Sequence, residues 1–174
     1  MKTYREDGAT MAVGGYLSEE VYQAMIMSIP IPCVDVVIVS RSSDPPSVLW
    51  LAHRMAKPWP RWWIIGGRMF AGETHDFAVQ RAFKRETRLD LAVERFQFLS
   101  ASAFIWKDRQ QEPQTAGSHN ISLAFVVDLT PSELAAVQLD AKEYHVEKGL
   151  KPFNRKDLTQ EHPVLLAHFD QIFA

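Results

Sequence analysis

A glutamate on the apolar side of a predicted helix is the first feature of this sequence that could do chemistry. Apolar residues recur at helical spacing over residues 74–89, and Glu86 falls within the stripe that they form at ~100° per residue. A lone carboxylate that faces a packed sheet is costly, so we expect it to be protonated, paired or bound to a metal ion. An ion pair with Arg81 or Arg54 is one interpretation of Glu86, and a metal site is the other.

The spacing of the residues before Glu86 favours the metal site. Gly67, Glu73, Arg81 and Glu86 are separated by five, seven and four residues. This arrangement resembles the Nudix box, Gly-x5-Glu-x7-Arg-Glu-φ-x-Glu-Glu-x-Gly-φ, in which φ is apolar. Two apolar positions of the box are matched by Phe83 and Leu89. The resemblance implies the Nudix fold, an α/β/α sandwich around a mixed β-sheet.

Three positions depart from the box. Ala82 and Arg85 stand where it has glutamates, and Arg88 stands where it has its last glycine. In ordinary Nudix pyrophosphatases the glutamates bind two or three divalent cations. The resemblance therefore implies that a single metal site remains here.

One Nudix subfamily, GDP-mannose mannosyl hydrolase, has a box thinned in the same way. The similarity extends from about Tyr16 to the C-terminal helix. The similar segments are Leu17-Ser18-Glu19-Glu20, Val34-Asp35, His53-Arg54, Lys57-Pro58, Trp62 to Arg68, Ser118-His119 and Glu143-Tyr144-His145. Within them, Ile65 replaces a proline of the subfamily, and Tyr144 replaces a glutamine that binds the metal ion.

This resemblance implies a set of site residues. One Mg²⁺ or Mn²⁺ would be held by Glu86 and the backbone carbonyl of Gly66. His145 would be the general base that activates water, because a neutral imidazole accepts a proton near working pH. The other implied catalytic residues are Arg68, Arg54 and Asp35, and the substrate would be bound by Arg54, Lys57, Arg68 and Asp35. Glu73 and Arg81 would have a structural role within the box.

The loop around Tyr144 leaves alternatives open. A neutral tyrosine is a poor magnesium ligand, so Glu143 or Glu147 is an alternative ligand, and each is also an alternative base. Apart from the resemblance, the simpler interpretation of His145 is a solvated histidine in a loop. Asp35 lies within an apolar strand, where a structural bridge to an arginine is an alternative to substrate contact.

The function implied by the resemblance is the hydrolysis of a nucleoside-diphosphate sugar. Water would attack the anomeric carbon, and the nucleoside diphosphate would leave with its charge spread over cations. One alternative is a conventional Nudix pyrophosphatase that cuts a P–O bond in ADP-ribose or a similar compound. Another is a binding module for nucleotide sugars that kept the fold and lost catalysis.

The elements that would position these residues alternate between helices and strands without a regular βαβ order. We expect helices at residues 18–29, at 74–89, from 130 and at 163–173, and strands at 33–39, 48–52, 62–65, 96–104 and 121–127. Residues 1–15 are polar, rich in glycine and without a period, so we expect a loose tail. The single Nudix domain would cover residues 16–174.

Composition excludes several classes of protein. The 174 residues include 19 Lys and Arg against 21 Asp and Glu, a net charge of −2, so no overall basic field exists for a nucleic acid. Apolar runs are too short to span a bilayer, and the N-terminus lacks the apolar segment of a signal peptide. A lone cysteine, Cys33, forms no intrachain disulfide. We expect a cytoplasmic protein with no nucleic-acid or membrane partner.

The N-terminal helix suggests self-association. Its apolar side chains lie on more than one side, which exceeds what one packed face requires. They are Val21, Tyr22, Met25, Ile26 and Met27. We therefore expect a homodimer, as in the subfamily that the chain resembles.

Overall fold

Strand β1 (Ile31–Val39) is the centre of the sheet because neighbouring strands pair with both of its edges. One edge pairs in parallel with β6 (Ser118–Asp128), and the other pairs antiparallel with β2 (Leu49–His53) and β4 (Ile65–Arg68). Strand β5 (Gln97–Trp106) pairs with β6, while β3 (Trp62–Trp63) and β7 (Leu150–Phe153) both pair with β2. The structure is a computed structural model that describes residues 2–4, 12, 14–41 and 47–174.

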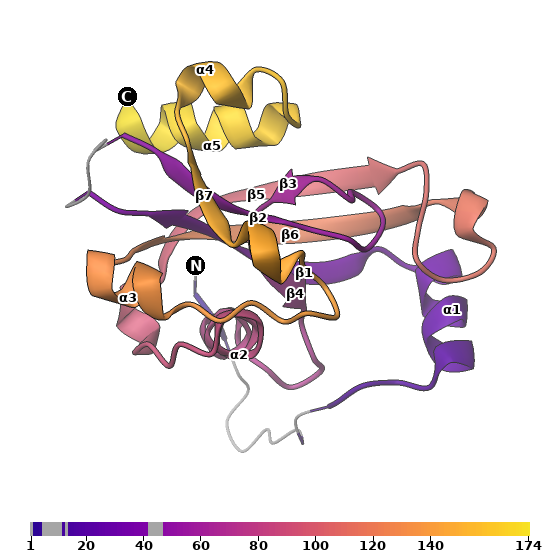
Figure 1. The fold of residues 1–174 in the computed structure, drawn as a ribbon. Coiled ribbons are helices and arrows are strands. Elements are labelled where there is room, and N and C mark those ends of the chain that lie inside the picture. Colours follow the sequence, from indigo (N-terminus) through magenta and orange to yellow (C-terminus); the bar gives the residue numbers. More distant parts are fainter. Residues whose placement is uncertain (1, 5–11, 13, 42–46) are drawn as a thin grey trace.

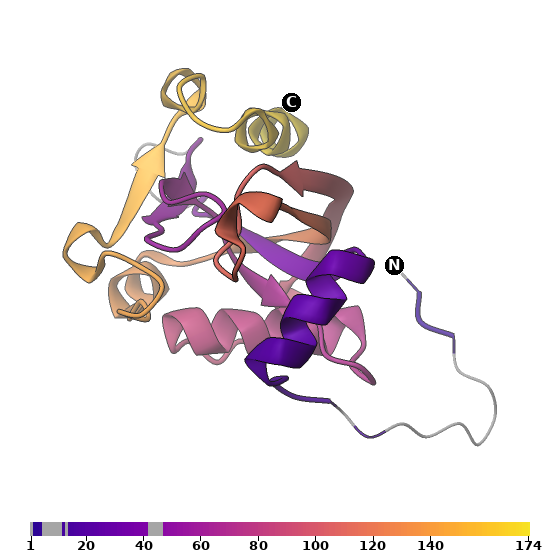
Figure 2. The ribbon, with the colours of Figure 1, turned by 90° about the vertical axis from the view of Figure 1, so that its right-hand side faces the viewer.

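Helices cover both faces of this mixed sheet (Figure 1). Helix α2 (His75–Thr87) lies against one face, and α5 (Pro163–Phe173) lies against the other with the short α4 (Arg155–Leu158). Helix α3 (Pro131–Ala136) lies on the side of α2, and α1 (Glu19–Ser28) lies at one end of the sheet (Figures 1 and 2). The α/β/α sandwich predicted from the sequence is confirmed.

Alternation along β1 divides the core into two clusters. Val34, Val36 and Ile38 pack with the buried face of α2, while Val37 and Val39 pack with the buried residues of α5. Successive side chains of a strand point to opposite faces, so a strand covered on both sides is apolar almost throughout. Asp35 interrupts that run on the edge where β4 pairs with β1.

Side chains at the helix ends explain two of the boundaries. The hydroxyl oxygens of Ser18 and Thr74 accept the backbone N–H of Val21 and Phe77 at the starts of α1 and α2. Helix α2 ends at Arg88, which adopts a left-handed conformation with φ 63°. That conformation favours glycine, so the last glycine of the Nudix box has a conformational role that Arg88 fills at some cost.

Several boundaries differ from the sequence predictions. The sequence does not predict strand β7 or helix α4, because each element has only four residues and shows no hydrophobic periodicity. Of the predicted tail, residues 1, 5–11 and 13 lie outside the described part of the chain, while the N–H of Gly14 donates to the carbonyl oxygen of Ala71 at 2.7 Å. No helix among the described residues has the length and apolar character to cross a membrane.

Helix α1 leaves apolar side chains at the surface. Val21, Met27 and Ile29 are 48%, 63% and 49% exposed, whereas Ile26 is buried. The exposure agrees with the pattern from which dimerisation was predicted. Association of two copies through α1 stays a prediction.

Candidate active site

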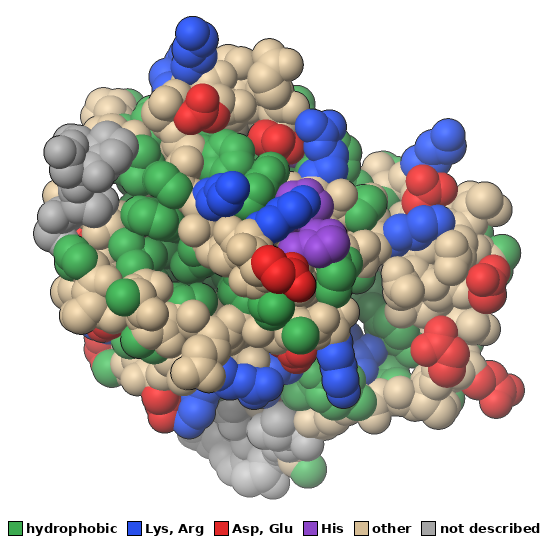
Figure 3. Space-filling view, viewed as in Figure 1, with side chains coloured by type: hydrophobic (Ala, Val, Ile, Leu, Met, Phe, Trp, Pro, Cys, Tyr) green, Lys and Arg blue, Asp and Glu red, His purple; other side chains and the backbone are tan. Residues whose placement is uncertain are grey.

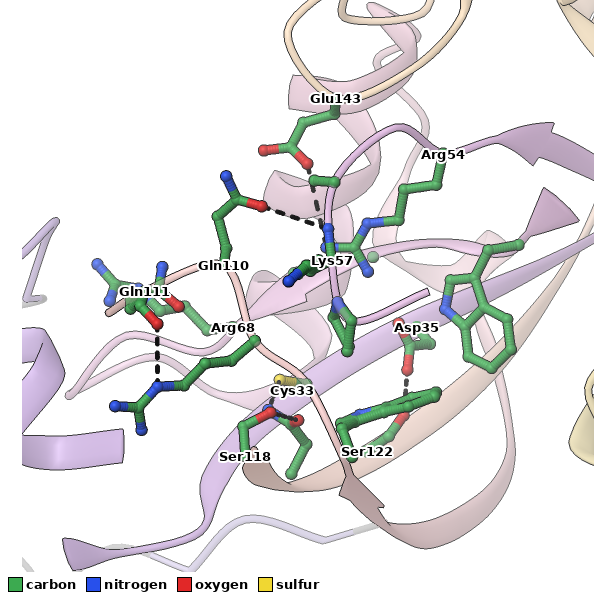
Figure 4. Close-up of a pocket in the computed structure, with 18 of the residues that line it drawn as sticks. Cys33, Asp35, Arg54, Lys57, Arg68, Gln110, Gln111, Ser118, Ser122 and Glu143 are labelled. Carbon is green, nitrogen blue, oxygen red and sulfur yellow. Dashed lines mark hydrogen bonds and ion pairs between the residues drawn. The ribbon is translucent and has the colours of Figure 1, made fainter. Parts of the chain in front are cut away.

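A cavity of about 400 Å³ opens between α1, strands β1 and β4, and the loops after β2, β5 and α3. Its polar lining includes Arg85 and Glu86. It also includes Asp35, Arg54, Lys57, Arg68, Gln110 and Glu143, which Figure 4 labels. Its aromatic lining includes Tyr16, Tyr22, Trp63, Phe104, Trp106 and Tyr144. Most of the residues singled out in the sequence therefore meet at one place.

Glu73 and Arg81 hold the loop between β4 and α2. The carboxylate of Glu73 accepts the backbone N–H of Phe70 at 2.8 Å and is bound by Nε and Nη2 of Arg81. Nη2 of Arg81 also donates to the carbonyl oxygen of Arg68 at 2.9 Å. Burial raises the pKa of Glu73, but the hydrogen bonds from Arg81 and Phe70 outweigh burial and lower it overall. These contacts are those expected of a structural brace, and that role of Glu73 and Arg81 stays a prediction.

Glu86 is 1% exposed and is paired with its sequence neighbour, Arg85. Nε of Arg85 donates to Oε1 of Glu86 at 2.7 Å, and Nη2 donates to the same oxygen. Nη2 also donates to the carbonyl oxygen of Gly66 at 3.3 Å, and Nη1 donates to the hydroxyl of Tyr16 at 2.5 Å. The guanidinium thus lies between the two groups that were expected to hold a metal ion.

The partner of Glu86 was therefore mispredicted. Of the two arginines considered, Arg81 binds Glu73, and Nη2 of Arg54 lies 4.0 Å from Oε2 of Glu143. Adjacent residues on a helix do not face each other, which makes a neighbouring residue an unexpected partner. The long side chain of Arg85 reaches Glu86 because its guanidinium packs against the backbone of Gly67 in β4.

Asp35 lies in the wall of the cavity against β4. One carboxylate oxygen, Oδ2, accepts the hydroxyl of Ser122, and the other lies so close to Gly66 that a Cβ there would meet it at 2.1 Å. Burial raises the pKa of Asp35 to about 6, against the opposing effects of the Ser122 hydrogen bond and the charge of Arg54. Gly66 is thus required for the close approach of these two strands.

Besides Arg85 and the buried Arg109, three cations line the cavity, two from the loop after β2 and one from β4. Arg68 ends β4, and its guanidinium lies 4.3 Å from the ring centroid of Tyr22. Nζ of Lys57 donates to Oε1 of Gln114 at 2.9 Å, and Arg54 approaches Glu143. Among the described residues neither Lys57 nor Arg68 forms an ion pair, so their charge is available to an anion in the cavity.

The predicted base, His145, does not line this cavity. Its backbone N–H donates to the carbonyl oxygen of His53 at 3.0 Å, and the two imidazole rings lie 4.9 Å apart. Histidine side chains reach the surface between basic and acidic side chains in Figure 3. Tyr144, which is 4% exposed, lines the cavity instead, as does Glu143 directly before it.

The loop between β5 and β6 contributes residues to the cavity, although the sequence predicts only a polar loop there. Arg109 is 2% exposed, and its guanidinium donates to the carbonyl oxygens of Gln111, Glu112 and Gly117. The next residue, Gln110, accepts the backbone N–H of Lys57 at 3.3 Å. No spacing signal marks this loop, because Arg109 binds backbone carbonyls of an irregular loop and Gln110 binds a distant segment.

The NUDIX domain family matches residues 30–169, which is most of the chain. The chain belongs to the Nudix family. Its fold resembles that of a MutT Nudix hydrolase from Burkholderia pseudomallei, with a TM-score of 0.62, 18% identity and coverage of 83% of this chain and 99% of that one. No curated protein matches the sequence.

Two further structures show how broad the likeness is. An Ap4A hydrolase from C. elegans has a TM-score of 0.54 and 13% identity over 83% of this chain and 96% of its own. A bifunctional NMN adenylyltransferase/ADP ribose pyrophosphatase from Francisella tularensis, described as complexed with AMP and a Mn ion, has a TM-score of 0.50 and 17% identity over 82% of this chain and 39% of its own. Identities this low show the fold, and Nudix membership supports a hydrolase of nucleotide-derived substrates.

Nudix hydrolases generally use divalent ions such as Mg²⁺ or Mn²⁺, but the residues here do not fit one as they stand. Within the described ranges, no three His, Cys, Asp or Glu side chains lie together as a metal site requires. Oε1 of Glu86 and the carbonyl oxygen of Gly66 already accept hydrogen bonds from Arg85. The other oxygen of Glu86 is buried without a hydrogen-bond partner in the described part of the chain, and Mg²⁺ takes six oxygen ligands.

Proposed function

We propose that this chain hydrolyses a nucleoside-diphosphate sugar, with GDP-mannose-like compounds as the first candidates, to a nucleoside diphosphate and a free sugar. The observation that carries the proposal is the group of three cations at one cavity. Arg54 and Lys57 come from the loop after β2 and Arg68 from the end of β4, and two of the three have no ion pair among the described residues. Fixed cations at one cavity bind a diphosphate and stabilise its charge as it leaves.

The cavity also offers surfaces for the rest of such a substrate. Trp63, Phe104 and Trp106 line it, and the rings of Phe104 and Trp106 stack at 5.3 Å with 10° between their planes. Aromatic faces of this kind suit a base or a sugar ring. Asp35, with a carboxylate oxygen in the cavity wall, is placed to accept a hydrogen bond from a sugar hydroxyl.

We assign the general base to Glu143 rather than to the predicted His145. Glu143 lines the cavity beside Arg54, and its side chain is 41% exposed, so water reaches it. In the proposed step Glu143 takes a proton from water, and the water oxygen bonds to the anomeric carbon. The bond from that carbon to the diphosphate oxygen breaks, and the electron pair leaves with the diphosphate, next to the three cations.

A second candidate function is binding of the same compounds without turnover. The observation that favours it is the placement of Arg85 between Glu86 and Gly66, where other Nudix proteins would be expected to hold a metal ion. Cleavage at phosphorus, as the names of the two further structural neighbours suggest for those proteins, is the outcome that would contradict the proposed step.

A panel of nucleoside-diphosphate sugars, each assayed with Mg²⁺ and with a chelator, tests the proposal. Free sugar and nucleoside diphosphate should accumulate together, and hydrolysis in ¹⁸O-water should place the label on the sugar. Label on phosphate with release of nucleoside monophosphate would establish a pyrophosphatase instead. Binding by calorimetry without any product would establish the binding module.

Variants of one loop then test the base. Glu143→Gln should lower kcat by ~10²–10⁴-fold with little change in substrate binding, which is the usual effect of removing a positioned base. Glu147→Gln is the matched control, because Glu147 lies in the same loop and does not line the cavity. A loss of that size in His145→Gln, with Glu143→Gln near normal, would restore the prediction made from the sequence.

A further inference from the structure

We propose that the guanidinium of Arg85 takes the place of the divalent cation of this Nudix site, so that the cavity holds its ligand without a metal ion. The first part of this inference concerns the protein alone. The second part, that a diphosphate is bound without metal, rests on the proposed function.

The guanidinium lies between the two oxygen ligands that a cation would need. Nε and Nη2 of Arg85 both donate to Oε1 of Glu86, at 2.7 Å in the case of Nε, and Nη2 reaches the carbonyl oxygen of Gly66 at 3.3 Å. A third nitrogen, Nη1, donates to the hydroxyl of Tyr16 from the segment before α1. Three separate segments thus hold the guanidinium in one position.

Small residues make room for this side chain. A Cβ added to Gly67 would meet Nη2 of Arg85 at 2.9 Å and Cζ at 3.6 Å, so the guanidinium lies directly against the backbone of β4. The same added atom would lie 3.7 Å from the Cβ of Ala82, which stands where the Nudix box has a glutamate. Two departures from the box therefore act together, since one supplies a cation and the other removes an acid next to it.

The charges of the site balance without a metal ion. Glu86 is buried, and its side chain is bound on one oxygen by a guanidinium whose own side chain is 31% exposed toward the cavity. A carboxylate and a guanidinium sum to zero, whereas a dication at the same place would face the positive charge of Arg85. The diphosphate is then bound by Arg54, Lys57 and Arg68, which need no bridging metal.

Binding of Mn²⁺ to the protein without nucleotide, followed by electron paramagnetic resonance, tests the first part. The wild-type chain should bind no Mn²⁺ at the Glu86 site. Arg85→Glu restores a box acid and should bind one Mn²⁺ at that site, at least tenfold more tightly than any residual binding to the wild-type chain, and the gain should vanish in Arg85→Glu/Glu86→Gln. Lys84→Glu is the matched control, because it makes the same charge change on the exposed side of α2 and should give no gain.

Arg85→Ala keeps the test decisive if Arg85→Glu does not fold, as judged by circular dichroism. It leaves Glu86 and Gly66 open and should also gain Mn²⁺, although less than the acidic variant. Mn²⁺ bound to the wild-type chain and lost in Glu86→Gln would overturn the inference. Folded Arg85 variants that bind no more Mn²⁺ than Lys84→Glu would overturn it equally.

Calorimetry with a nucleoside diphosphate tests the second part. Its Kd for the wild-type chain should agree within twofold between excess chelator and Mg²⁺, whereas Mg²⁺ should tighten binding to Arg85→Glu at least tenfold. A wild-type chain that binds the nucleotide only with Mg²⁺ contradicts metal-free binding. A chain that binds no nucleotide under either condition contradicts the proposed function, and the Mn²⁺ measurement still decides the role of Arg85.

Discussion

Two carboxylate–guanidinium pairs in the same Nudix box differ in what surrounds them. Glu73 and Arg81 lie eight residues apart, and their pair also binds backbone groups of Phe70 and Arg68. Glu86 and Arg85 are adjacent, and their pair borders a cavity. The first pair binds the backbone of a loop, whereas the second lies in the cavity wall, where a bound ligand can contact it.

Pairing with a guanidinium does not by itself define the role of a buried glutamate. Both glutamates have buried side chains, 5% and 2% exposed, and both bind a guanidinium. The difference lies in the remaining hydrogen bonds, because Glu73 also accepts a backbone N–H while one oxygen of Glu86 has no partner among the described residues. Variants of each pair, ranked by expected effect, test this distinction.

Arg81→Met should have the largest effect, a loss of about 3 kcal/mol in the free energy of unfolding, because it leaves the buried carboxylate of Glu73 without its counter-charge. It also removes the guanidinium that lies 3.9 Å from the ring centroid of Phe70. Urea denaturation at neutral pH measures the loss. Lys84→Met, on the exposed side of the same helix, should change the free energy by less than about 0.5 kcal/mol and serves as the control. Equal values for both variants would contradict the bracing role.

Arg85→Met should cost less, about 1–2 kcal/mol, because the cavity beside Glu86 admits water and the arginine is already partly exposed. Adding Glu86→Gln should recover about 1 kcal/mol of that loss, since the double variant no longer contains an unpaired buried carboxylate. The four proteins of this double-mutant cycle are compared by urea denaturation. A double variant no more stable than Arg85→Met would show that the pair contributes by packing and not by charge.

Most of the fold could be predicted from the sequence because its signals are local. The β-branched run of β1, the cap at Ser18 and the apolar stripe of α2 each specify an element within a few residues. Strand β7 could not be found in this way, since its four residues pair with β2 across the chain and two of them are exposed. The pairing with β2 that defines β7 leaves no periodic pattern in the four residues of β7.

The candidate site was predictable in some of its members, but neither in its pairings nor in the residues of the loop between β5 and β6. Spacing identified Glu73, Arg81 and Glu86, yet the partner of Glu86 depends on the path of one flexible side chain over a glycine loop. Which residues of the segment 143–145 line the cavity is likewise set by contacts with a distant part of the chain. Tyr144 forms an isolated bridge with Arg54, and the backbone N–H of His145 donates to the carbonyl oxygen of His53.

A third pair outside the box should show the smallest effect and the clearest pH dependence. Nη1 and Nη2 of Arg95 bind the carboxylate of Glu133 at 3.0 and 3.1 Å, and Glu133 also accepts the backbone N–H of Thr130 at the start of α3. The hydrogen bonds from Arg95, and then from Thr130, lower the pKa of Glu133 from 4.5 to about 2. A lowered pKa in the folded state means that the stabilisation is complete above pH 4.5 and is lost as the pH falls toward 2.

Glu133→Gln should therefore cost about 1 kcal/mol at neutral pH, the usual effect of a cap in a partly exposed position. The difference in melting temperature between wild type and variant should shrink steadily between pH 5 and pH 2, and a constant difference over that range would show that the charge of Glu133 contributes nothing.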